Sequence, residues 1–128
     1  MNFIYITCLQ IYIFNEYFTK GSIFIIILFY SEFCIFQLSS KITLCSIKGY
    51  CLGGGAELSL CFDLRVASET AIIGFPEVSI GIIPGAGGTQ RLPRIIGLSN
   101  AKYWIYTAKK FNAKESLNYN FVNFITKE

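Results

Sequence analysis

The sequence predicts a single α/β domain. Short runs rich in β-branched residues alternate with segments of helical character, and two glycine-rich loops join them. No repeat of about 20 to 50 residues is visible, which excludes a solenoid. The 128 residues suffice for one modest domain and not for two. Apolar residues make up 53% and charged residues 15%, so a disordered chain is excluded.

The first predicted elements surround a glycine triplet. The loosely alternating segment Lys41 to Ile47 is rich in β-branched residues and predicts a strand. Gly53 to Gly55 then form a loop in which the backbone can adopt unusual dihedral angles and approach a ligand closely. A short helix is expected to begin near Ala56.

Two further strands are predicted at residues 64–68 and 71–74. Pro76 lacks an N–H group and restricts the preceding residue, so it marks a break. A second glycine-rich loop at residues 84–88 leads into a helix that is expected to end at Gly97.

The last third predicts two helices and a strand. Ser99 is a candidate N-cap for a helix over residues 101–108. Asn112 and Glu115 have the spacing of a capping box, which predicts the start of another helix. Residues 121–126 are expected to form a closing strand.

Composition divides the chain near residue 40. Residues 1–40 carry three charges, whereas residues 41–128 carry sixteen, so we expect a hydrophobic N-terminal segment followed by a domain at 41–128. The longest apolar run, Ile23 to Tyr30, is shorter than the ~20 residues that a membrane helix needs. Its β-branched and aromatic content favours a strand or buried segment over a membrane anchor.

Several classes of function are excluded. The chain has no histidine, which rules out His-based triads, haem ligation by histidine and most catalytic zinc sites. The net charge of +3 is spread without a basic run, so nucleic-acid binding is not expected. Five cysteines at positions 8, 34, 45, 51 and 61 show no metal-binding spacing and suit reduced, buried thiols.

Two acids are candidates for proton transfer. Glu57 follows the glycine triplet, and its neighbours one turn on, Leu60 and Cys61, place it on an apolar face. Burial there would raise its pKa towards the range of a general acid or base, although an acid paired with a helix N-terminus is the simpler alternative. Glu77 follows Pro76, and its simpler alternative is a solvated turn residue. The glycine triplet itself suits either a tight turn or an oxyanion hole.

Three stretches, taken in order, resemble the crotonase or enoyl-CoA hydratase/isomerase superfamily. They are IKGYCLGGGAELSLCFDLRVAS, AIIGFPEVSIGIIPGAGGTQRLPRIIG and SNAKYWIYTAKKFNAKESLNYNFVN, and they extend from about residue 41 to about residue 122. The combination of GGGAE, FPE and PGAGGTQRLPR in this order is specific to that superfamily. The resemblance implies a partial crotonase-like fold of repeated ββα units that is truncated at both ends relative to the family.

The resemblance also assigns roles. It implies that Glu57 activates a water, that Glu77 protonates the carbon next to the thioester, and that the N–H of Gly54 forms part of an oxyanion hole. Gly53 and Gly85 are expected to line the substrate pocket. The implied reaction is syn addition of water to a 2-enoyl-CoA thioester in fatty-acid or branched-chain amino-acid catabolism. It uses no metal or other cofactor, because coenzyme A is part of the substrate.

Departures from the family pattern carry further expectations. Residues 1–40 do not match the segment that supplies the second oxyanion donor in relatives, and one lost donor lowers the rate by roughly a hundred to a thousand fold. Little or no activity is therefore expected of the chain as given, and a non-catalytic fragment is one alternative. Asn120 stands where relatives place a glycine.

Other family activities are also alternatives, namely methylglutaconyl-CoA hydratase and enoyl-CoA isomerase; the presence of both acids favours hydration. The family implies a homo-trimer or hexamer, an expectation that the truncation weakens. It also implies a mitochondrial location, with the cytoplasm as the alternative because no transit peptide is visible.

Overall fold

The computed structural model describes residues 4–7 and 37–127. The apolar run Ile23 to Tyr30 lies outside the described residues, as do Cys8 and Cys34. No helix within the described part of the chain is both long and apolar enough to cross a bilayer. Mixed strands and helices confirm the predicted α/β class.

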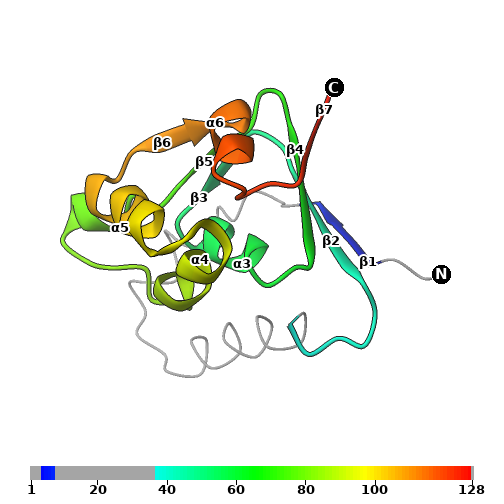
Figure 1. Ribbon diagram of the computed structural model, residues 1–128, viewed down its shortest axis with the longest axis horizontal. Helices are drawn as coiled ribbons and strands as arrows, with labels where there is room; N and C mark the ends of the chain where they lie inside the picture. The colour runs from blue at the N-terminus through cyan, green and yellow to red at the C-terminus, as the bar shows by residue number, and fades with distance from the viewer. Residues whose placement is uncertain (1–3, 8–36, 128) are drawn as a thin grey trace, which may run out of the picture.

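A four-stranded parallel sheet forms one side of the molecule (Figure 1). Its order is β1-β2-β4-β7, with β1 at Ile4–Thr7, β2 at Thr43–Ile47, β4 at Leu64–Ser68 and β7 at Phe124–Thr126. Alternate residues of β2, beginning with Thr43, are buried, which agrees with the alternation seen in the sequence. The predicted strands at 41–47, 64–68 and 121–126 are therefore confirmed, with shorter bounds for the first and last.

A second sheet contains three short strands in the order β3-β5-β6. They are β3 at Tyr50–Leu52, β5 at Ile72–Gly74 and β6 at Lys110–Asn112. β3 runs parallel to β5, and β6 runs antiparallel to β5. The sequence did not predict β3 or β6, because each has three residues and only its middle residue is buried. Strands this short show no periodicity.

The helices lie to one side of the four-stranded sheet in the view of Figure 1, with α6 next to β7. They are α3 at Gly54–Ser59, α4 at Gly88–Ile96, α5 at Leu98–Thr107 and α6 at Ala113–Asn118, with a 3₁₀ turn η1 at Glu77–Ile80. The capping box of Asn112 and Glu115 is confirmed, since each side chain accepts a hydrogen bond from the other residue's backbone N–H.

Two predicted helix starts are corrected by glycines. α3 begins at Gly54 rather than near Ala56, because Gly53 adopts a φ of 56° at the N-cap and the helix follows at once. α5 begins at Leu98, and Gly97 rather than Ser99 is its N-cap. Gly97, at a φ of 83°, ends α4 and begins α5 within one residue. Glycine adopts such positive φ values at little cost, which permits both abrupt turns.

An aromatic cluster fills the core between α5 and the three-stranded sheet. Trp104 is fully buried and stacks on Phe111, with ring centroids 4.0 Å apart, and on Phe121 at 5.3 Å. Phe75 and Tyr119 pack against its ring at angles. Because Phe75 lies two residues before Glu77, this cluster supports the segment that carries the second acid.

A buried arginine joins the segment before β4 to the segment before β7. Arg65 on β4 donates from Nε to the Phe121 carbonyl at 2.6 Å and from Nη1 to the Phe62 carbonyl at 2.7 Å. These bonds satisfy carbonyl groups that the chain buries outside regular structure. Nearby, Asn120 has a φ of 63°, so the position at which the family resemblance leads us to expect a glycine is left-handed in this chain. Asparagine tolerates this conformation better than most residues.

Candidate active site

Glu57 and Glu77 lie at the same edge of the three-stranded sheet. Glu57 follows β3 and Glu77 follows β5, and these two strands are parallel neighbours with Leu52 opposite Gly74. The carboxyl ends of parallel strands meet at one edge, which is where ligands bind in α/β folds. The Gly53 N–H donates to the Gly74 carbonyl at 3.0 Å and continues the pairing one residue further. The chain therefore places the two acids on adjacent loops.

The glycine triplet fits closely beside Glu77. A Cβ atom on Gly53 would lie 3.1 Å from Glu77 Oε1, so the carboxylate packs directly on this backbone. Gly54 is the first residue of α3, and the first N–H bonded within that helix belongs to Glu57, which donates to the Gly53 carbonyl at 2.9 Å. The N–H of Gly54 precedes that bond and is not used by the helix. Gly53 and Gly54 both line a pocket with Glu77.

The carboxylate of Glu57 is bound by the second glycine-rich loop. Its Oε1 accepts hydrogen bonds from the N–H groups of Ala86 and Gly88, both at 2.8 Å. Gly88 is the first residue of α4, so the acid lies at a helix N-terminus, where the helix dipole favours a negative charge. Glu57 itself belongs to α3, so the dipole that acts on its carboxylate is that of a neighbouring helix. The prediction that Glu57 faces inwards is confirmed, since the residue is 3% exposed.

Opposing effects act on the ionisation of Glu57. Burial raises the pKa of its carboxyl above the ordinary value, while the hydrogen bonds from Gly88 and Ala86 and the charge of Arg91 lower it. Burial is the largest effect, so the pKa is raised overall. The bonds to Oε1 favour the ionised form at one oxygen, and Oε2 takes no part in them. A carboxylate held in this way can accept a proton on Oε2.

Glu77 lies in a less polar environment. It is 9% exposed, which excludes the solvated-turn alternative, and its Oε2 is buried without a hydrogen-bond partner in the described structure. Burial raises the pKa of the Glu77 carboxyl, and the nearby charge of Glu57 raises it further. A carboxyl with few donors and a negative neighbour retains its proton to higher pH. The hydrogen bonds and the charge of Arg91 favour the ionised form of Glu57, whereas the surroundings of Glu77 favour its protonated form.

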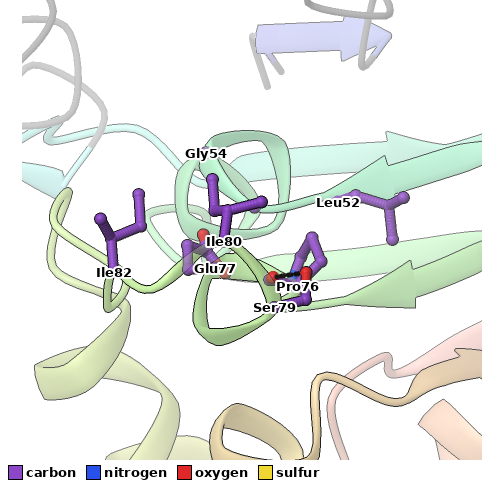
Figure 2. Close-up of a pocket in the computed structure, with 8 residues that line it drawn as sticks. Leu52, Gly54, Pro76, Glu77, Ser79, Ile80 and Ile82 are labelled. Atoms are coloured by element: carbon purple, nitrogen blue, oxygen red, sulfur yellow. Dashed lines mark hydrogen bonds between the residues drawn. The ribbon is translucent and has the colours of Figure 1, made fainter.

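A pocket of about 280 Å³ opens at Glu77. Figure 2 shows the Glu77 side chain among the lining residues, with Ile80 and Ile82 beside it. Both isoleucines are more than half exposed, so the wall of the pocket is apolar and open to solvent. An acid at the base of an apolar pocket, next to backbone N–H groups, suits proton transfer to an organic substrate.

Gly85 lies in the loop before α4, next to Ala86, and is exposed. A Cβ atom added there would meet nothing within 4 Å. The role of this loop in binding Glu57 was missed by the sequence analysis, as was Arg91, which contacts the loop from α4. The rule that helix N-termini bind anions could have suggested the role of the loop, because the loop leads directly into α4.

A methyl group at Gly88 is expected to disturb the acid. The Cβ of a Gly88→Ala variant would lie 2.9 Å from Glu57 Oε1 and 3.1 Å from the Pro84 side chain. Overpacking costs about 1–3 kcal/mol, and the helical preference of alanine offsets at most about 1 kcal/mol. Urea unfolding should therefore show a lower free energy of unfolding for this variant. Gly85→Ala is the matched control, and equal stability of the two variants would contradict the contact.

Removing the charge of Glu77 is expected to stabilise the fold. A carboxyl whose pKa is raised in the folded state binds more protons there than in the unfolded state, so stability falls as pH rises through the interval between the ordinary and raised values. Glu77→Gln should therefore raise the free energy of unfolding at pH values above that interval, and by less below it. Denaturant unfolding at several pH values measures this. Exposed Glu69→Gln is the control; a gain independent of pH would contradict the explanation.

Comparison with known proteins gives consistent matches. A profile of the family described as Enoyl-CoA hydratase/isomerase matches residues 29–128 and so begins upstream of the expected start at residue 41. Crotonyl-CoA hydratase of Syntrophomonas wolfei is 45% identical over 71% of this chain and 35% of its own length. The Arabidopsis thaliana protein named Probable enoyl-CoA hydratase 2, mitochondrial is 46% identical over 71% of this chain and 30% of its own length.

Solved structures agree with this similarity. The enoyl-CoA hydratase of Bacillus anthracis has a TM-score of 0.80 and 37% identity, over 85% of this chain and 44% of that structure. The chain thus spans about a third of the length of the curated relatives that it matches.

Proposed function

Because the chain belongs to the enoyl-CoA hydratase/isomerase family, we propose that Glu57 and Glu77 are the acid/base pair of a site that hydrates 2-enoyl-CoA thioesters. The observation that carries this proposal is the pair of buried carboxyls on adjacent loops, with one held by two N–H groups and the other in an apolar pocket. Presence of both acids favours hydration over isomerisation.

The proposed reaction divides the work between the acids. Oε2 of ionised Glu57 accepts a proton from a water, whose oxygen forms a bond to the β-carbon of the enoyl group. The electrons of the carbon–carbon double bond move towards the thioester oxygen, which the N–H of Gly54 stabilises as negative charge develops. Protonated Glu77 then gives its proton to the α-carbon. The product is a 3-hydroxyacyl thioester, and no metal or redox cofactor is required.

The substrate would occupy the space around the pocket. Gly53 lines it beside Glu77, and the apolar wall formed by Ile80 and Ile82 suits an acyl chain. The exposed position of Gly85 next to the residues that bind Glu57 supports its role in lining the same site. We propose an acyl-CoA thioester as the ligand on this basis.

Hydration of crotonyl-CoA as a function of pH tests the proposal. The rate requires ionised Glu57 and protonated Glu77, so it should fall at low pH as Glu57 takes up a proton and at high pH as Glu77 loses one. Both limbs should lie above the ordinary carboxyl value of 4.5, because burial raises both pKa values. Loss of the enoyl-thioester absorbance measures the rate. A measurable hydration rate that stays constant from pH 4 to 9 would overturn the assignment.

Family membership also supports assembly and location as proposals. Large apolar side chains such as Ile83 and Leu98 are exposed, and exposed apolar surface supports the homo-trimer or hexamer that the family implies. Sedimentation velocity would distinguish these from a monomer. The mitochondrial name of the Arabidopsis relative supports a mitochondrial location for this chain, whereas bacterial relatives support the cytoplasmic alternative.

A further inference from the structure

We propose that Arg91 is a positioning residue for Glu57, because it holds the loop whose N–H groups bind the carboxylate. This inference rests on the function proposed above. It assigns a role to the arginine of the GGTQR stretch, which donates hydrogen bonds to Ala86 and Gln37.

The argument begins at Ala86, which is held from both sides. Its N–H donates to Glu57 Oε1 at 2.8 Å, and its carbonyl accepts a hydrogen bond from Arg91 Nη1, also at 2.8 Å. The guanidinium group is thus one residue removed from the acid. A shift of the Ala86 backbone would move the N–H that binds Glu57, so the arginine limits where that donor can lie.

The turn at Gly87 explains why the N–H groups on either side of it, those of Ala86 and Gly88, reach one oxygen. Gly87 has a φ of 98°, and this left-handed residue lies between Ala86 and Gly88, whose N–H groups both point at Glu57 Oε1. A Cβ atom on Gly87 would lie 1.9 Å from Arg91 Nη1, so the guanidinium occupies the space that a side chain would fill. Glycine at this position serves both the turn and the arginine.

The opposite edge of the guanidinium is also fixed. Arg91 Nε and Nη2 donate to Gln37 Oε1 at 3.1 Å and 2.9 Å. A planar guanidinium bonded along two edges has little freedom to rotate. A chain of contacts therefore runs from Gln37, ahead of β2, through Arg91 and Ala86 to Glu57.

The charge of Arg91 also acts on Glu57, in addition to the hydrogen bonds that hold the loop. Arg91 lowers the pKa of the Glu57 carboxyl and opposes the effect of burial, and Glu57 in turn raises the pKa of Glu77. Among the described residues, Arg91 and Glu77 are the charged groups coupled to Glu57, and its remaining partners are the N–H groups of Ala86 and Gly88. The arginine favours the ionised form that accepts a proton from water.

Nuclear magnetic resonance of the full chain tests the inference without any need for turnover. Carboxyl ¹³C shifts would follow the titration of Glu57, and amide ¹H shifts of Ala86 and Gly88 would report their hydrogen bonds to it. In Arg91→Met, the pKa of Glu57 should rise, and the response of the Ala86 amide to that titration should fall by about half or more. An unchanged pKa together with an unchanged Ala86 response would overturn the proposal.

Two further variants complete the experiment. Arg91→Lys keeps the charge but lacks the two-edged guanidinium, so the pKa should stay near that of the unsubstituted chain while the Ala86 response still falls. This variant decides the outcome if Arg91→Met does not fold, and an unchanged Ala86 response would again overturn the proposal. Arg94→Met is the matched control, since Arg94 is exposed on the same helix and donates a hydrogen bond to the Gln90 carbonyl of its own helix; both readouts should be unchanged.

Activity provides an independent second readout. Hydration of crotonyl-CoA by Arg91→Met should fall about tenfold in kcat with little change in KM, because the acid is displaced while the pocket is intact. A hydration rate that is unchanged in both Glu57→Gln and Glu77→Gln makes the proposed function fail, while the resonance measurements still decide the role of Arg91. The two failures are therefore distinguishable.

Discussion

Glu57→Gln is expected to lower the hydration rate of crotonyl-CoA by about two to four orders of magnitude, the usual contribution of a general acid or base. Glutamine has the same shape, and its side-chain oxygen can still accept the hydrogen bonds from Ala86 and Gly88. The loop should therefore remain in place while the carboxylate that we propose as the proton acceptor is lost. The loss of enoyl-thioester absorbance at high protein concentration measures the rate.

The control for this prediction is Glu69→Gln, which changes an exposed acid away from the site and should leave the rate unchanged. Amide spectra of both variants should superimpose on that of the unsubstituted chain, which separates a chemical effect from unfolding. A Glu57→Gln variant that hydrates crotonyl-CoA at the original rate would remove Glu57 from the mechanism.

Trp104→Ala is expected to cost about 3–5 kcal/mol of folding free energy, which is a large part of the stability of an ordinary domain. The indole ring is fully buried and stacks between Phe111 and Phe121, so its removal leaves a cavity that rigid neighbours cannot fill. Urea unfolding followed by circular dichroism measures the loss. Because Phe75 also contacts the ring, the segment leading to Glu77 should lose order first.

Tyr106→Ala is the matched control on the same helix. Tyr106 is 68% exposed and its removal creates no cavity, so the change in stability should be within about 0.5 kcal/mol. Equal losses for Trp104→Ala and Tyr106→Ala would show that helix content, rather than the aromatic cluster, determines stability here.

Local sequence patterns predicted much of the fold and failed at particular places. β2 and β4 have enough residues for their composition to identify them. The capping box identifies the start of α6 because its two residues are only three positions apart in the sequence. β3 and β6 depend on pairing with β5, which is a long-range contact that no local pattern encodes. The burial of Arg65 was equally out of reach, since its carbonyl partner at Phe121 lies far along the chain.

The candidate site shows the same division. The glycine triplet and the apolar neighbours of Glu57 were enough to select that acid, and family resemblance selected Glu77 as its partner. What the sequence could not show is how each acid is held. The donors to Glu57 come from residues 86 and 88, and their convergence depends on the left-handed turn at Gly87 and on the docking of α4 against α3.

The pairing of Leu52 with Gly74 determines how the loops that carry the two acids are placed relative to each other. Successive residues in a strand are about 3.3 Å apart, so a slip of one residue between β3 and β5 would separate the carboxyls by about that distance. It would also turn alternate side chains to the opposite face of the sheet. The ladder of three residue pairs therefore fixes the relative position of the two acids. An insertion between Gly74 and Glu77 would change that position while leaving both acids in the chain.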